Sequence, residues 1–251
     1  MSAVIAGHLL IGSISALQKM YRILRPYRVG IYGPSMTGKT TLDQYLTVPG
    51  DIDPIPVEMR TSHAMVNGRP KLPKAHRKLI RWKKDRVPIS NSDVAGQAQF
   101  RNLWIEDMFS RKCEIVIFMV DHRVLTSPSF LRESLASFKY LIDNITRTDV
   151  STVISRKARK TSKSTYMPKV FLFLINKMDV WWSPEANVLW ANQLQREHPI
   201  VVPFRSELKR LRKKGVRAEI DAISAQHGVN VEKVLLSIVE LIWLTGLGWL
   251  T

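Results

Sequence analysis

The chain has 251 residues and carries 38 lysine and arginine residues against 21 acidic ones, a formal net charge of +17. Its hydrophobic fraction of 45% is enough for one sizeable core, and the length favours one domain with insertions over two domains. The single cysteine, Cys113, excludes an internal disulfide, is expected in the core, and indicates a reducing, cytoplasmic compartment.

The first 26 residues are predicted to form an amphipathic helix. Apolar residues recur there at spacings of 4, 3, 4 and 3, at Leu10, Ile14, Leu17, Tyr21 and Leu24. No positive charge precedes the apolar run at 3–17, so it does not resemble a secretory signal, and it is shorter than the ~20 residues of a spanning helix. Lys19 and Arg22 fall on the polar side, so this helix can lie on an anionic membrane, pack on the core or pair with another protein.

Strand patterns and helix patterns alternate along the rest of the chain. A short strand is predicted at 28–32, followed by a glycine-containing loop and a helix that begins near Lys39. Residues 51–56 indicate a loop, and the next 30 residues are irregular, apart from an alternating stretch at 76–82. The continuous apolar runs at 114–120 and 169–175 are typical of strands buried on both faces of a parallel sheet.

Apolar residues recur with helical spacing at 129–145, which predicts a helix there. The later elements are predicted as a helix at 187–197, a strand at 219–223 and a closing helix at 231–244. This alternation predicts an α/β fold with a mostly parallel sheet and helices on both faces. The expected organisation is the N-terminal helix at 1–26 and one domain at 27–251, with basic insertions near 69–86, 146–168 and 205–217.

Most of the positive charge lies in three stretches. Residues 69–86 hold nine basic residues and one acid, residues 156–163 hold five and none, and residues 205–217 hold seven and one. The remainder is near neutral, so these stretches predict an acidic partner, either an anionic membrane surface or an acidic protein. Nucleic acid ranks lower because aromatic residues are not interleaved, Trp82 excepted, and the plain alternative is a solvated surface.

Residues 33–40 read G-P-S-M-T-G-K-T and match the pattern G-x-x-x-x-G-K-[ST], after a predicted strand and before a helix. The glycines let the backbone curl so that its N–H groups face phosphate oxygens, while Lys39 reaches the outer phosphates and Thr40 offers its hydroxyl to Mg²⁺. The motif predicts a nucleoside triphosphate site. Its candidate contact residues are Gly33, Ser35, Met36, Thr37, Gly38, Lys39, Thr40 and Thr41.

Residues 176–179 read N-K-M-D and follow the second apolar run, at the expected carboxyl edge of the sheet. A carboxylate at Asp179 can accept two hydrogen bonds from the guanine edge, whereas adenine offers no such pair of donors. This sequence resembles the N-K-x-D guanine-specificity motif of Ras-like GTPases, which implies that Asn176, Lys177 and Asp179 bind the base. A loop with a capping residue is the alternative interpretation.

Residues 93–97 read D-V-A-G-Q and resemble the switch motif D-V-G-G-Q of Arf-like GTPases and heterotrimeric α subunits. The resemblance extends to residues 100–104, F-R-N-L-W, against the family's F-R-x-x-W. It implies that Asp93 reaches Mg²⁺ through water, that the Gly96 N–H contacts the γ-phosphate, and that Gln97 orients the attacking water. Ala95 departs from the second glycine of the family and is expected to stiffen the segment.

Two further elements follow from this resemblance. Ser224, Ala225 and Gln226 open a stretch similar to the S-A-x-x-G loop near the guanine O6. Thr61 is the candidate switch threonine and a third Mg²⁺ ligand, and Arg60 beside it is a candidate arginine finger or an ordinary surface arginine.

The motifs together imply a P-loop NTPase three-layer fold and a Ras-like GTPase, closest to the Arf-like and α-subunit members. The expected activity is a slow, magnesium-dependent hydrolysis of GTP to GDP that drives a molecular switch, with Gln97, Lys39 and Arg60 as catalytic candidates. The alternative is a weakly hydrolysing GTP-binding subunit that serves as a docking or assembly platform. Effector and regulatory proteins are the expected partners, and the expected location is cytoplasmic, with peripheral membrane attachment as an alternative.

Overall fold

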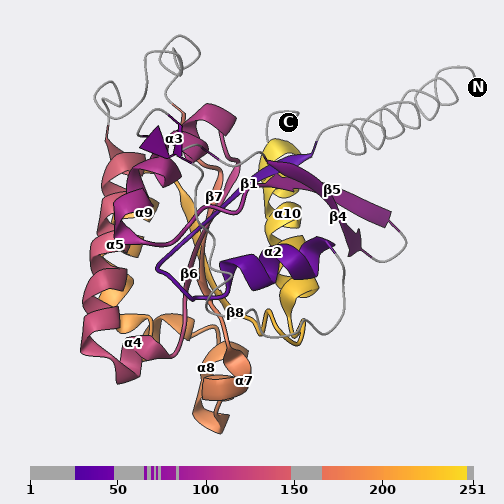
Figure 1. The fold of residues 1–251 in the computed structure, drawn as a ribbon. Helices are drawn as coiled ribbons and strands as arrows, with labels where there is room; N and C mark the ends of the chain where they lie inside the picture. Colours follow the sequence, from indigo (N-terminus) through magenta and orange to yellow (C-terminus); the bar gives the residue numbers. More distant parts are fainter. Residues whose placement is uncertain are drawn as a thin grey trace, which may run out of the picture.

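The computed structural model describes residues 26–47, 65–66, 69–70, 72, 75–82, 85–147 and 166–247 (Figure 1). The predicted N-terminal helix, the pair Arg60 and Thr61, and most of the basic stretch 146–168 lie outside these residues. Within the described part, no helix combines the length and the apolar character that a membrane crossing requires.

A six-stranded sheet forms the centre of the fold, in the order β4-β5-β1-β6-β7-β8. Its strands are β1 (Tyr27–Tyr32), β4 (His76–Trp82), β5 (Asp85–Asn91), β6 (Ile115–Val120), β7 (Val170–Ile175) and β8 (Arg217–Ala222). The pairs from β5 to β8 are parallel, and only the edge strand β4 runs antiparallel to its neighbour. Two short strands, β2 (Met65–Val66) and β3 (Arg69–Pro70), pair separately.

Helices cover both faces of this sheet, which explains why its central strands are apolar throughout. Alternate side chains of β6, such as Ile117, pack with helices α2 (Lys39–Thr47) and α10 (Val231–Leu247). The intervening ones, such as Phe118, pack with α3 (Arg101–Arg111), α5 (Pro128–Thr146) and α9 (Arg205–Lys213). Figure 1 shows these two helical layers on opposite sides of the sheet. The predicted three-layer α/β fold, with a mostly parallel sheet and helices on both faces, is confirmed.

The remaining helices are short and lie mainly around the carboxyl ends of the strands. They are α4 (Arg123–Thr126), α7 (Met178–Trp181), α8 (Pro184–Ala191) and the 3-10 turns η2 (Ala98–Phe100), η3 (Gln195–Glu197) and η4 (Val202–Phe204). Helix α8 was predicted at 187–197 but begins earlier, because the Ser183 side chain caps it by accepting a hydrogen bond from the Ala186 N–H. The chain leaves that helix after Ala191 and turns through η3.

The region predicted as irregular contains the β4–β5 hairpin, which extends the main sheet. Lys78 of β4 is buried and pairs with the Asp43 carboxylate of α2, while its ammonium also donates to the Asp43 carbonyl at 2.7 Å. The basic stretch 205–217 forms α9 and the start of β8, and Leu208 and Leu211 of α9 are buried in the core. Two of the three basic stretches therefore contribute elements to the fold itself.

Cys113 is fully buried, as expected, and burial raises the pKa of its thiol to about 12.

The topology of the sheet indicates where a ligand can bind. From β1 the chain continues to β4 and β5 on one side, and from β6 it continues to β7 and β8 on the other, so adjacent β1 and β6 lead in opposite directions. In open α/β sheets ligands bind at the carboxyl ends of such a strand pair.

Candidate nucleotide-binding site

The loop between β1 and α2 has a backbone that its glycines make possible. Gly33 has φ 143° and Gly38 has φ 90°, both in the region that side chains disfavour. A Cβ on Gly33 would lie 2.2 Å from the Met119 carbonyl oxygen, and one on Gly38 would lie 2.1 Å from Nδ2 of Asn176. Between them Met36 adopts a left-handed φ of 63° with its side chain 44% exposed. The two glycines are thus required both by conformation and by space.

Lys39 opens α2 and folds back beneath this loop. Its Nζ donates to the Gly33 carbonyl at 3.0 Å and to the Pro34 carbonyl at 2.7 Å, and the residue is only 7% exposed. No carboxylate of a described residue forms an ion pair with it, and burial lowers its pKa to about 8. Among the described residues its ammonium hydrogen-bonds to carbonyl oxygens alone, and a buried cation of this kind favours the arrival of an anion.

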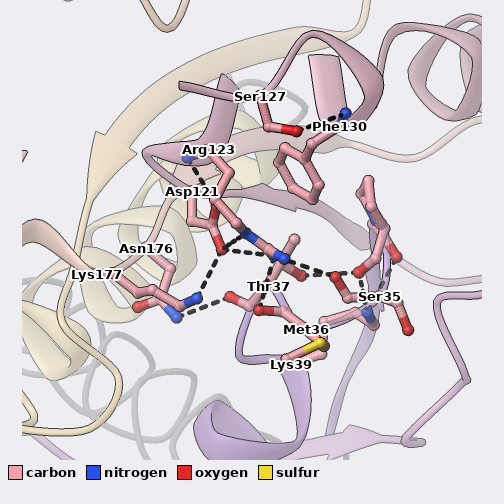
Figure 2. Close-up of polar contacts among 12 residues, drawn as sticks. Ser35, Met36, Thr37, Lys39, Asp121, Arg123, Ser127, Phe130, Asn176 and Lys177 are labelled. Carbon is pink, nitrogen blue, oxygen red and sulfur yellow. Dashed lines mark hydrogen bonds and ion pairs between the residues drawn. The ribbon is translucent and has the colours of Figure 1, made fainter. Parts of the chain in front are cut away.

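Asn176 connects three loops through one buried side chain. Its Nδ2 donates to the Thr37 carbonyl at 2.8 Å, and its Oδ1 accepts from the Ala225 N–H at 2.9 Å. The loop after β1, the N-K-M-D loop after β7 and the loop after β8 are therefore fixed to one another. Residues predicted from three separate motifs are therefore neighbours at the carboxyl ends of β1, β7 and β8, and Figure 2 shows those of the first two motifs.

Lys177 and Asp179 of the N-K-M-D loop have different surroundings. Lys177 has a left-handed φ of 58°, and its Nζ lies 2.8 Å from Oδ2 of Asp121. Asp179 lies in the first turn of α7, is exposed, and makes no ion pair within the described part of the chain. The indole N–H of Trp181 donates to the Asn176 carbonyl at 2.9 Å, and this hydrogen bond ties the loop to α7. The Asp179 carboxylate remains available to a ligand.

Asp121 and Arg123 are site residues that the sequence interpretation missed. Asp121 directly follows β6 and is completely buried. Burial alone would raise the pKa of Asp121, but hydrogen bonds from Arg123 and Lys177 hold it below its usual value. Nη2 of Arg123 also donates to the carbonyls of Ser35 at 3.2 Å and Met36 at 3.0 Å. For Asp121 the available signal was a polar residue directly after an apolar strand, which is also what marked Asn176.

Thr40 and Asp93, two of the predicted magnesium ligands, are hydrogen-bonded neighbours. The Thr40 hydroxyl donates to Oδ2 of Asp93 at 3.0 Å across 53 residues of sequence. Within the described ranges there is no group of three or more His, Cys, Asp or Glu residues suited to a metal. Mg²⁺ does not need one, because one carboxylate, one hydroxyl, water and phosphate oxygens complete its shell. The two residues fit the ion, while Thr61, the third predicted ligand, lies outside the described residues.

The segment 93–97 passes directly over the glycine loop. A Cβ on Gly96 would lie 2.4 Å from Nζ of Lys39 and 2.6 Å from the Gly33 carbonyl oxygen, so only glycine fits there. The Ala95 carbonyl accepts a hydrogen bond of 2.8 Å from the indole N–H of Trp104, which fastens the segment to α3. The buried Oε1 of Gln97 has no hydrogen-bond partner among the described residues. Gln97 therefore keeps an unused acceptor beside Gly96.

The loop after β8 makes contacts that say less about the ligand. Ser224 is buried and its backbone N–H donates to the Val229 carbonyl at 3.1 Å, closing the loop that presents the Ala225 N–H to Asn176. The Ser224 hydroxyl has no partner in the part of the chain that the structure describes. Gln226 is half-buried beside it, and Thr41 is half-buried in the first turn of α2.

No protein-family model matches the chain, and no curated protein matches it. Among solved structures it is similar to a bacterial selenocysteine-specific elongation factor, EF-Sec, with 19% identity and a TM-score of 0.47. The match covers 87% of this chain and 29% of that one. The functional interpretation therefore rests on the geometry of the site.

Proposed function

We propose that this protein binds the guanine nucleotides GTP and GDP with Mg²⁺ and hydrolyses GTP slowly, as a molecular switch. The observation that carries the proposal is the Asn176 side chain, which joins the glycine loop and the N-K-M-D loop by hydrogen bonds. That arrangement sets an exposed carboxylate, Asp179, beside a loop suited to phosphates. A ligand with guanine at one end and phosphates at the other satisfies both.

Each part of the site has a role in this proposal. The N–H groups of the glycine loop and the ammonium of Lys39 bind the phosphates, and Thr40 and Asp93 hold Mg²⁺, which neutralises charge on the phosphate oxygens when bound. Gln97 orients the attacking water, since its amide oxygen can accept a hydrogen bond from that water beside Gly96. Slow turnover is expected for a site of this type without an added arginine; Arg60 is a proposed source, and a partner protein is another.

A second candidate function is a GTP-binding platform with little hydrolysis. The observation that favours it is the hydrogen bond from Trp104 to the Ala95 carbonyl, which ties the segment 93–97 to α3. A segment held in this way moves less when the γ-phosphate is lost. Single-turnover hydrolysis by the parent and by Gln97→Ala separates the two functions, because only the switch predicts a turnover that this substitution slows by tenfold or more.

Partners and location remain proposals as well. Exposed lysines at 209, 213 and 214 place positive charge on and after α9, on the molecular surface. We propose an acidic protein face or an anionic membrane as the partner, with effector and regulatory proteins recognising the nucleotide state in the cytoplasm. Binding to anionic vesicles that persists in high salt would contradict an electrostatic origin.

The direct test of nucleotide choice is a competition titration with GTP, GDP and ATP, in Mg²⁺ and again with a chelator. The proposal expects guanine nucleotides to displace a fluorescent GDP far more effectively than ATP, and expects the chelator to weaken GTP binding. Equal displacement by ATP would refute guanine recognition, and an indifference to the chelator would refute the Thr40–Asp93 metal site.

A further inference from the structure

Arg123 is fixed from several sides next to the glycine loop. Its Nε lies 2.9 and 3.1 Å from the two oxygens of Asp121, and its Nη2 lies 2.8 Å from Oδ2. The guanidinium carbon stands 4.1 Å from the centre of the Phe130 ring. Phe130 belongs to α5, whose start is capped by the Ser127 hydroxyl. Figure 2 shows the guanidinium between Asp121 and the carbonyls of the loop.

The two loop carbonyls that Arg123 binds are consecutive, those of Ser35 and Met36. The described peptide bonds are all trans, so in each peptide plane the N–H points opposite to the carbonyl. The N–H groups of Met36 and Thr37 therefore point away from Arg123. A cation that holds a carbonyl on one side of a peptide thus sets the direction of the donor on the other side.

Asn176 continues the same pattern by one peptide. Its Nδ2 holds the Thr37 carbonyl, so the Gly38 N–H points away from Asn176. Three successive peptides, from Ser35 to Gly38, are held by side chains from the loops after β6 and β7. The left-handed φ of Met36 is the strained point of this turn, and both of its flanking peptides are held by Arg123.

We propose that Arg123 is a positioning residue for phosphate binding: it fixes two peptides of the glycine loop with their N–H groups turned toward the phosphates. The inference rests on the nucleotide binding proposed above. Arg123 does not touch the nucleotide in this role, but its charge polarises the peptides it binds and strengthens their donors. Because Asp121 also binds Lys177, the same network joins the phosphate end to the base end.

The test compares Arg123→Ala and Arg123→Lys with the parent and with Arg132→Ala, which removes an exposed arginine of α5. GDP affinity is measured by competition, guanosine is titrated at high concentration, and the ³¹P spectrum of bound GDP is recorded. Arg123→Ala should weaken GDP binding by about tenfold, because two charge-assisted hydrogen bonds that hold the donors are lost. It should leave guanosine binding within about twofold and move the β-phosphate resonance.

Arg123→Lys should recover part of the GDP affinity, because an ammonium keeps the charge but cannot bridge two carbonyls and a carboxylate. If Arg123→Ala fails to fold, the lysine variant still has to shift the β-phosphate resonance, and Arg132→Ala must not. Unchanged GDP affinity and an unchanged resonance would overturn the inference, as would equal losses for GDP and guanosine. A parent protein that binds neither GDP nor guanosine would overturn the proposed function and this inference together.

Discussion

The two ends of the proposed site, the glycine loop for phosphates and the N-K-M-D loop for the base, are built in different ways. At the end proposed for phosphates the charged group, Lys39, is 7% exposed and its ammonium donates to carbonyl oxygens. At the base end the charged group, Asp179, is exposed on a short helix, and its loop is fixed through Asn176 and Trp181. In the proposed function, the buried Lys39 contributes affinity for phosphates, and the exposed Asp179 contributes selectivity for the base through its hydrogen-bond pattern.

The largest expected effect is at the base end. Asp179→Asn should weaken the binding of GDP by about 10⁴-fold and leave the binding of ADP unchanged, because the amide presents a donor to the guanine N–H groups. Xanthine nucleotides should gain affinity, since their altered edge accepts that donor. Competition titrations with GDP, XDP and ADP check this, and Glu185→Gln on the exposed face of neighbouring α8 is the control. Equal losses for GDP and ADP would show that Asp179 does not read the base.

Lys39→Met should weaken the binding of guanine and adenine nucleotides alike, by about three orders of magnitude, because a buried charge partner of the phosphates is lost. Lys177→Met removes the other lysine near the site, which pairs with Asp121, and should cost less. Equilibrium titration with fluorescent GDP measures both. A loss confined to guanine nucleotides would contradict a role for Lys39 at the phosphates.

Without nucleotide, Lys39→Met should stabilise the fold by up to about 3 kcal/mol. The reason is that the pKa of Lys39 falls from 10.5 to about 8 on burial, and each unit corresponds to about 1.4 kcal/mol. Lys78 is equally buried but has a carboxylate partner in Asp43, so Lys78→Met should destabilise the fold by about 1–3 kcal/mol. Denaturant unfolding of the two variants gives the signs, and a shared sign would remove the distinction between these lysines.

The smallest expected effect is a pH dependence of binding. Phosphates favour protonated Lys39, and the free group has a pKa of about 8, so binding takes up a proton above that pH. GDP affinity should therefore change little below pH 8 and fall about tenfold between pH 7 and pH 9. Calorimetry in two buffers measures the proton uptake. Lys39→Arg, whose guanidinium stays charged, should abolish it, and an unchanged uptake would assign the proton to another group.

Much of the fold is determined by local patterns in the sequence. The two apolar strands, β6 and β7, and helix α5 were predicted because burial on both faces and helical periodicity leave a signal within a few residues. The glycine loop was predicted for a similar reason: its conformation depends on Gly33 and Gly38, and its chemistry on adjacent residues. The roles assigned to Gln97 and Arg60 stay predictions.

The alternating stretch at 76–82 coincides with β4, but β5 and the hairpin were missed, because the pairing of β5 with β1 and with β4 is a tertiary contact. The Arg123 contacts were also invisible in the sequence, because they join residues 87 and 88 positions apart. Asn176 reaches Thr37 across 139 positions. The sequence by itself determined which loop could hold phosphate, since backbone conformation is local. Only the tertiary structure decided which distant side chains hold that loop, because the sheet order brings the ends of β1, β6 and β7 together.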